Sequence, residues 1–217
     1  AVPPTVDLES LEELVNVVRH TGLVHMSAET SLFYPWVFYC RERFAAGDFG
    51  DFVYAESQYM HDLEHLSVYK DYLETGDERF RRDAGLPPMF YATHSISMPL
   101  AVTGAHVTEV TCMGFEDRAD DAVYGRGNNH WDNPFSNQSA LMRTSDGGVL
   151  RINEMRRIGW RSPIDVHMRF YGTEASFEQH AHAACWVTKD REQWEDLYES
   201  RLKVSESETV AGALGEE

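Results

Sequence analysis

The segment 164–171 constrains the fold most, because its apolar residues recur at every second position. These residues are Ile164, Val166, Met168 and Phe170. A period of two predicts a β-strand with one buried and one exposed face. The same period predicts further strands at 52–61, 106–115, 137–144, 149–157 and 175–179. We therefore expect an open, mostly antiparallel sheet whose polar face is partly covered by helices or by a partner subunit.

The first fifty residues have a different pattern, which predicts helices. A helix is expected over 7–20, with Asp7 as its cap and Gly22 as its stop. A short apolar strand follows at Leu23–Ala28, and a second helix is expected over 35–47. The order helix, strand, helix is that of the closing piece of a doubly wound domain whose earlier strands are absent.

The rest of the chain adds turns, loops and short helices. Asp146-Gly147-Gly148, between two predicted strands, is typical of a hairpin turn. A helix is predicted over 95–103, and the loop 116–135 has a length that often accompanies function. We expect one more short helix that carries Trp194 and Leu197.

Length and composition set the domain organisation. The chain has 217 residues, 42% of them hydrophobic, which fits one domain with part of another attached. It opens at Ala1 without a Met, so we expect a fragment. The fold class is α/β (α+β): residues 1–30 would end a doubly wound domain, 31–204 would form an α/β domain, and 205–217 a flexible tail.

Charge and cysteine content exclude several classes of function. Nineteen basic and 36 acidic residues give a formal net charge of −17, which disfavours nucleic acid as a partner. No apolar run approaches the roughly 18 residues that a membrane span needs. Cys40, Cys112 and Cys185 are sparse and lie in apolar runs, so we expect free core thiols and a reducing, cytoplasmic compartment.

The segment Tyr91–Ser95 is the best candidate for chemistry. Thr93 or Ser95 can cap the helix that follows, which places His94 at its positive end. That field favours the neutral imidazole, the form that accepts a proton. Tyr91 would supply a phenolic hydroxyl to the same pocket. The alternative is a buried His94 that bonds to a backbone carbonyl.

A second polar group ends the strand 52–61. Its alternation puts Phe52 on one face, and Tyr59 and His61 on the other, where they would form a proton relay or hydrogen bonds to a polyol. The alternative for Tyr59 is a core aromatic with its hydroxyl at the rim. Residues 61–65 also match the zinc motif H-x-x-E-H, but the strand pattern through His61 argues against a helix there, and we expect no metal.

Several segments resemble the Gfo/Idh/MocA family of oxidoreductases, over about residues 1–204. They are "RTSDGGVLRINEMRR", "MRFYGTEASFE", "SAET", "QYMHDLEH" and "YATHS". Members pair a Rossmann domain with an open, mostly antiparallel sheet. The resemblance therefore implies that residues 1–30 are the C-terminal remnant of a Rossmann NAD(P)-binding domain and that 31–204 form the substrate domain. The sequence is most similar to the branch in which Glu-Lys-Pro is replaced by Glu-Val-Pro, which includes NAD-dependent N-acetylgalactosaminidases. Ala1-Val2-Pro3 stands at that place, so the usual lysine is missing.

The resemblance implies hydride transfer between a sugar or polyol and NAD or NADP, with the nucleotide bound mostly by residues outside this chain. His94, assisted by Tyr59 and Tyr91, would be catalytic. The substrate side would consist of Tyr59, His61, Arg82, Tyr91, Ala92, Thr93 and His94. The nicotinamide side would consist of Ala1, Val2 and Thr30.

Two other functions remain open from the sequence. One is an NAD-dependent glycoside hydrolase that works by oxidation, elimination, addition and reduction. The other is a non-catalytic sugar-binding or dimerisation module. In each case we expect a homo-oligomer formed through the open sheet.

Overall fold

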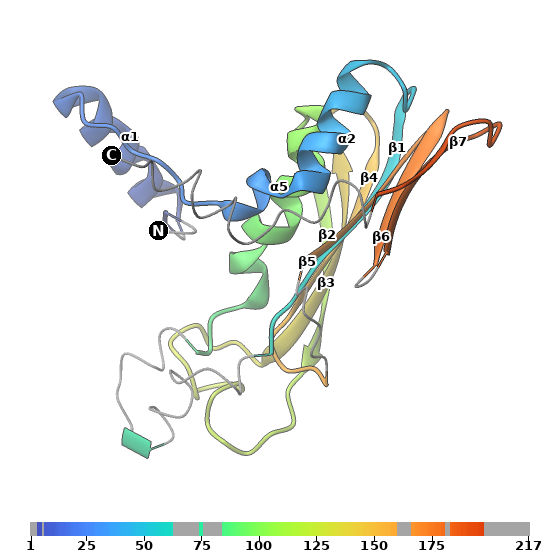
Figure 1. The fold of residues 1–217 in the computed structure, drawn as a ribbon. Helices are drawn as coiled ribbons and strands as arrows, with labels where there is room; N and C mark the ends of the chain where they lie inside the picture. The colour runs from blue at the N-terminus through green and yellow to red at the C-terminus, as the bar shows by residue number, and fades with distance from the viewer. Residues whose placement is uncertain are drawn as a thin grey trace, which may run out of the picture.

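A computed structural model of the chain describes residues 4–5, 7–62, 74–75, 84–159, 166–180 and 183–197. The helices and 3₁₀ turns are α1 (Leu8–Thr21), η1 (Thr30–Phe33), α2 (Pro35–Ala45), η2 (Pro88–Tyr91) and α5 (Thr93–Thr103). The strands are β1 (Phe52–Met60), β2 (Val107–Glu116), β3 (Phe135–Thr144), β4 (Val149–Met155), β5 (Val166–Gly172), β6 (Ala175–His180), β7 (Ala183–Thr188) and β8 (Trp194–Asp196). The sheet with α2 and α5 forms the body of the molecule, and α1 stands apart from it (Figure 1).

The eight strands form one open sheet in the order β2-β3-β4-β1-β5-β6-β7-β8. Every neighbouring pair is antiparallel except β1 and β4, which run parallel. The expected open, mostly antiparallel sheet is therefore confirmed. The hairpin between β3 and β4 is confirmed as well, and Gly147 adopts a φ of 92° in its turn, a conformation that favours glycine.

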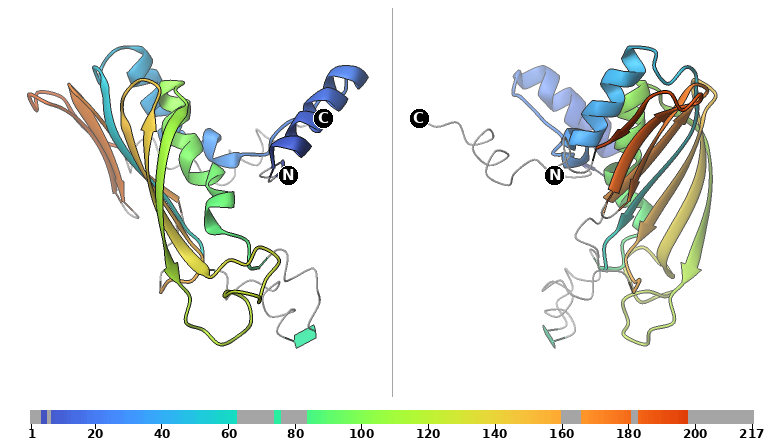
Figure 2. Two further views of the ribbon diagram at one scale, coloured as in Figure 1. Left: turned by 180° about the vertical axis from the view of Figure 1, so that it is seen from behind. Right: turned by 45° about the vertical axis from the view of Figure 1, so that its right-hand side comes forward.

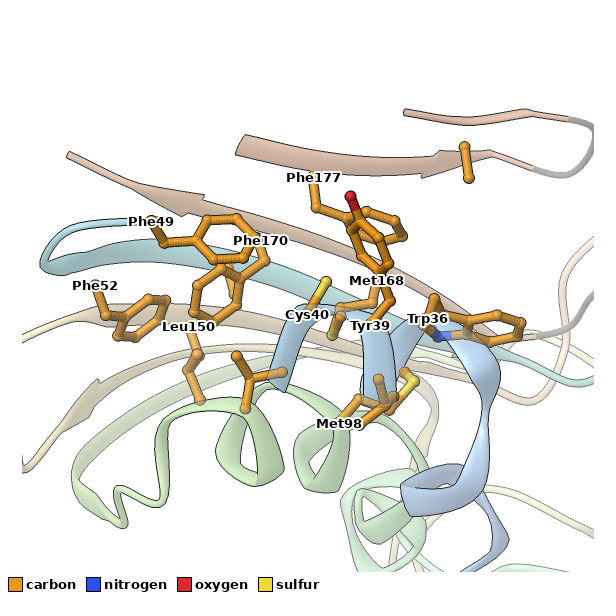
Figure 3. Packing of buried hydrophobic residues seen from close by; sticks show 14 of the residues in the cluster. Trp36, Tyr39, Cys40, Phe49, Phe52, Met98, Leu150, Met168, Phe170 and Phe177 are labelled. Carbon is orange, nitrogen blue, oxygen red and sulfur yellow. The ribbon is translucent and has the colours of Figure 1, made fainter. Parts of the chain in front are cut away.

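Helices α2 and α5 pack against each other on one face of the sheet and leave the other face open (Figure 2). Beneath them lies the hydrophobic core, in which the Phe170 ring is 5.0 Å from the ring of Phe49 and 4.8 Å from that of Phe52 (Figure 3). Burying one such side chain stabilises the fold by about 1.5–3 kcal/mol. This packing holds α2 and α5 on one face of the sheet. It thereby also positions the side chains at the end of β1 that lie on the same face.

Strand β1 alternates as predicted over most of its length. Ala55 and Ser57 are buried on the helix-covered face, and Tyr59 follows on the same side. At the start of the strand a register shift turns Phe52 into the core and leaves Val53 48% exposed. The assignment of Phe52 to the opposite face from Tyr59 was therefore wrong, because a bulge inserts one residue there.

In the N-terminal segment the predicted helix is confirmed, whereas the predicted strand is wrong. α1 begins after Asp7, which accepts a hydrogen bond from the Ser10 N–H at 2.7 Å, and it ends at Gly22, whose φ is 70°. None of its residues is buried. Residues Leu23–Ala28 are exposed and form no strand. A strand needs a neighbour that pairs with its backbone, and the described residues offer none at this place.

The predicted helix near the C-terminal end was wrong. Trp194 belongs to β8, which pairs with β7, a strand that the sequence periodicity did not reveal. The free edge of β7 offers backbone hydrogen bonds to this segment, whereas a short isolated helix is marginal. Leu197, 1% exposed, then joins the core.

Strand β2 lies at the edge of the sheet beyond the two helices, and its residues are exposed after Val107. Cys112 is therefore exposed, so its assignment to the core was wrong. Cys40 is fully buried, Cys185 is intermediate, and all three thiols are free. No helix among the described residues combines the length and the hydropathy that a membrane crossing requires.

Candidate functional site

Polar side chains from four segments meet at the C-terminal end of β1, on the helix-covered face. β1 contributes Tyr59 and, just beyond its end, His61. The first turn of α5 contributes His94, and Glu29 precedes η1 as its N-cap. β4 runs beside β1 and places Glu154 in register with Tyr59. The strand pairing and the helix packing thus bring together groups that are distant in sequence.

The phenol of Tyr59 lies between two imidazoles. Its hydroxyl is 2.5 Å from Nδ1 of His61. Its ring meets the His94 ring edge to face, with centroids 4.9 Å apart and an interplanar angle of 76°. The structure therefore brings together three of the residues that the sequence selected. Imidazole and phenol groups can donate or accept a proton, so the cluster has the composition of an acid–base centre.

Glu29 orients His94. Its carboxylate Oε1 is 2.9 Å from Nδ1 of His94 and also accepts a hydrogen bond from the Ser31 N–H at 2.8 Å. Burial by itself would raise the pKa of Glu29, but the hydrogen bonds with His94 and Ser31 and the charge of His94 lower it overall. Glu29 is therefore an ionised acceptor, and a neutral His94 must carry its proton on Nδ1. Nε2 is then the nitrogen that can accept a proton from a substrate.

The floor of the site is a buried ion pair. Glu154 is completely buried, and Arg156 is 3% exposed. Nη2 of Arg156 donates to Oε2 of Glu154 at 2.8 Å, and the Ser95 hydroxyl donates to Oε1. Burial raises the pKa of Glu154 to about 7, although Arg156, Ser95 and His94 act to lower it. The pair connects β4 with the first turn of α5.

The guanidinium of Arg156 also contacts both tyrosines of the site. Its Cζ lies 4.8 Å from the ring centroid of Tyr59 and 5.1 Å from that of Tyr91. A cation over an aromatic face is attracted by the ring quadrupole, and the attraction grows when both groups are desolvated. Arg156 therefore connects the Tyr59 and Tyr91 rings.

The start of α5 differs from the prediction in one detail. Its N-cap is Ala92, which makes no side-chain cap hydrogen bond, so neither Thr93 nor Ser95 caps the helix as expected. The Ser95 hydroxyl instead donates hydrogen bonds to the Ala92 carbonyl oxygen, at 3.1 Å, and to Glu154. His94 nevertheless lies in the first turn of the helix.

The remaining selected residues are placed as follows. Ala92 packs against the core, and Thr30 is exposed in η1 beside Glu29. Ala1, Val2 and Arg82 lie outside the described residues, as do positions 63–65 of the zinc motif. The described part of the chain contains no group of three His, Cys, Asp or Glu residues that would hold a metal ion.

Three residues of this cluster were not selected from the sequence. Glu154 and Arg156 follow Leu150 and Ile152 in the same period of two, so charges continue the buried face of β4. Two opposite charges at positions that continue the buried face of a strand indicate a buried ion pair. Glu29 has no comparable pattern, because its partner is 65 residues away.

No family model and no curated protein matches the chain. Solved structures do match. A UDP-N-acetylglucosamine 3-dehydrogenase from Acidithiobacillus ferrooxidans is 18% identical, with a TM-score of 0.62 over 89% of this chain and 52% of that chain. An inositol dehydrogenase homolog from Azotobacter vinelandii, complexed with NADH and myo-inositol, is 14% identical. Its TM-score is 0.64, and the match covers 88% of this chain and 46% of that chain.

An oxidoreductase from Agrobacterium radiobacter, in complex with NAD+, L-tartaric acid and magnesium, is 10% identical, with a TM-score of 0.65 over 89% of this chain and 51% of that chain. The chain thus spans about half the length of the structures that it matches. These matches show that the chain has the fold of the matched part of these structures, as the expected open sheet with helices on one face requires.

Proposed function

We propose that this chain is the substrate-binding and catalytic half of an NAD(P)-dependent oxidoreductase that acts on a sugar or polyol. The observation that carries the proposal is the arrangement of Glu29, His94 and Tyr59, because it presents an oriented base beside a phenol. The fold supports it, since one structure with the same fold holds NADH and myo-inositol. In this proposal residues 1–30 end the nucleotide-binding domain, and 31–204 form the substrate domain.

The exposed apolar surface of the N-terminal segment fits the remainder of a nucleotide-binding domain. α1 leaves apolar residues such as Leu8 and Val17 exposed, at 69% and 49%. In η1, Phe33 is 66% exposed next to Thr30, which directly follows Glu29. Apolar surface of this kind is stabilised by a covering partner. A nicotinamide nucleotide bound there would accept or return the hydride.

The chain's own residues would move the proton. During oxidation the substrate O–H bond breaks and the proton passes to Nε2 of His94, while the electron pair of the neighbouring C–H bond leaves as hydride. Glu29 holds the ring and balances the charge of the imidazolium that forms. Tyr59, hydrogen-bonded to His61, would bind an adjacent hydroxyl. Tyr91, Ala92, Thr93 and Arg82 remain proposed substrate contacts.

Replacing His94 tests this function in the protein that includes the nucleotide-binding domain. His94→Ala should lower kcat for sugar oxidation by about 10²–10⁴-fold, the range of general acid–base catalysis. Glu29→Gln should lower it by a smaller factor, because the base stays in place but loses its orienting carboxylate. His106→Ala, at an exposed position before β2, is the control. Unchanged turnover in His94→Ala would remove this residue from the mechanism.

A second candidate is the NAD-dependent glycoside hydrolase. It is favoured by the number of proton-transfer groups, since Tyr59 and His61 form a pair separate from Glu29 and His94. Oxidation at C3 of the sugar, elimination of the aglycone, addition of water and return of the hydride need more than one acid–base group. Release of the aglycone from a chromogenic N-acetylgalactosaminide without net NADH would support this reaction, whereas stoichiometric NADH would support the dehydrogenase.

We also propose that the chain forms a homo-oligomer through the open face of the sheet. That face exposes Met113, Phe115 and Leu141 at 51–78%. It also holds a hollow of about 410 Å³, lined in part by Gln58 and Arg169, on the opposite face from the His94 site. Analytical ultracentrifugation tests the proposal: a protein that stays monomeric at high concentration contradicts it, and a charged residue at Leu141 should dissociate an oligomer.

A further inference from the structure

We propose that the buried Glu154–Arg156 pair is a positioning element that sets the two tyrosine rings against His94, an inference that rests on the proposed function. Arg156 would orient Tyr59 and Tyr91, and Glu154 would hold Arg156 in place and join β4 to α5. Neither charge reaches the open side of the site, so neither is assigned a contact with the substrate.

The first argument is the location of the charges. Leu150 and Ile152 fill the preceding positions of the same face with apolar side chains, both fully buried. Replacing a buried ion pair by apolar residues is often neutral or stabilising, so stability alone gives no reason for charges here. A role in orienting neighbouring groups is therefore the better explanation.

The second argument is the geometry of Arg156. Its planar guanidinium lies within about 5 Å of two aromatic rings from different elements, Tyr59 in β1 and Tyr91 in η2. A planar guanidinium can present its face to aromatic rings and its N–H groups to a carboxylate at the same time, and an ammonium group does not reproduce this geometry. The Tyr59 ring also contacts the His94 ring.

The third argument is the connection through Glu154. It is the register partner of Tyr59 across the parallel β1–β4 pair. It also accepts a hydrogen bond from the hydroxyl of Ser95, the residue after His94. One carboxylate thus ties the strand of the phenol to the helix of the base.

The neighbouring arginine shows what a purely structural role looks like. Arg157 points away from the site and bonds to Asp117 at 2.8 Å and to Asp121, both in the loop after β2. Its Cζ lies 5.2 Å from the ring of Tyr124, which is buried in the same loop. These contacts anchor a loop, whereas those of Arg156 lie between two predicted site residues.

The test combines fluorine NMR with kinetics, in the protein labelled with 3-fluorotyrosine. Arg156→Met should shift the resonances of Tyr59 and Tyr91, assigned from Tyr→Phe variants, and should lower kcat for sugar oxidation by about 10- to 100-fold without changing the KM for the nucleotide. Arg156→Lys keeps the charge, so it should restore the free energy of unfolding but neither the resonances nor kcat. If Arg156 had only a structural role, Arg156→Lys would restore kcat together with the free energy of unfolding.

The control is Arg43→Met, which removes a cation of α2 that is paired with Glu195 and lies over the rings of Tyr39 and Trp186, where α2 meets β7 and β8. It should move the Tyr39 resonance and leave kcat unchanged. Unshifted Tyr59 and Tyr91 resonances in a folded Arg156 variant would overturn the proposal, as would shifted resonances with unchanged kcat. If the unsubstituted protein oxidises no sugar, the proposed function fails, and the resonances alone decide whether Arg156 positions the rings.

Discussion

Replacing Glu154 by glutamine should change how the stability of the chain depends on pH. Burial raises the pKa of Glu154 from 4.5 to about 7 in the folded chain. Between these values the folded chain keeps a proton on Glu154 that the unfolded chain has lost, so the free energy of unfolding falls as the pH rises. The contribution of Glu154 to the free energy of unfolding is therefore complete below its pKa in the unfolded chain, and it is lost as the pH rises through its pKa in the folded chain. The shift corresponds to about 3 kcal/mol over the whole window.

The amide that Glu154→Gln introduces cannot titrate, so the difference in free energy of unfolding, wild type minus variant, should fall across this window. Urea unfolding followed by the fluorescence of the buried Trp36 and Trp186 measures it. The variant also leaves Arg156 without its carboxylate, but that cost is a constant offset, and the slope carries the test. Arg156→Met removes the opposing charge and should extend the fall to higher pH. A difference that stays flat or rises with pH would show that the ion pair outweighs desolvation.

Two further predictions concern packing and thiol chemistry. Gly172→Ala should destabilise the chain by about 1–3 kcal/mol, because its Cβ would overlap the Phe49 carbonyl oxygen, whereas Gly159→Ala meets no atom within 4 Å; urea midpoints of the two variants test this. A thiol reagent should modify the exposed Cys112 in the native state and Cys40 only on unfolding, because burial raises the pKa of the Cys40 thiol well above its ordinary value. Peptide mass mapping checks the order, and rapid native labelling of Cys40 would contradict it.

Most of the sheet could be predicted because its strands alternate on a half-buried surface. Val166, Met168 and Phe170 face the helices as the period of two requires. The same reasoning failed where pairing outweighs pattern. Trp194 is a strand residue because β7 offers it a free edge, and residues Leu23–Ala28 are not a strand because the described residues place no edge near them. Periodicity describes one segment and contains nothing about its neighbours.

The candidate site was predictable in part for the same reason. Tyr59 and His61 could be assigned to one face, and His94 to a helix start, from local patterns. Their convergence depends on the register of β1 with β4, which no local pattern contains. Glu29 shows the limit most clearly, because it joins His94 through packing of η1 on α5 rather than through any shared element.

The central place of β1 has a consequence for how the chain reaches its native state. β1 leaves the ribosome before its neighbours β4 and β5, so Tyr54 must wait for Val149 on one side and Tyr171 on the other. Such distant pairing closes long loops and slows folding. During synthesis both edges of β1 stay open, which makes this interval the one most exposed to aggregation. The acid–base cluster at its end consequently forms late, with the middle of the sheet.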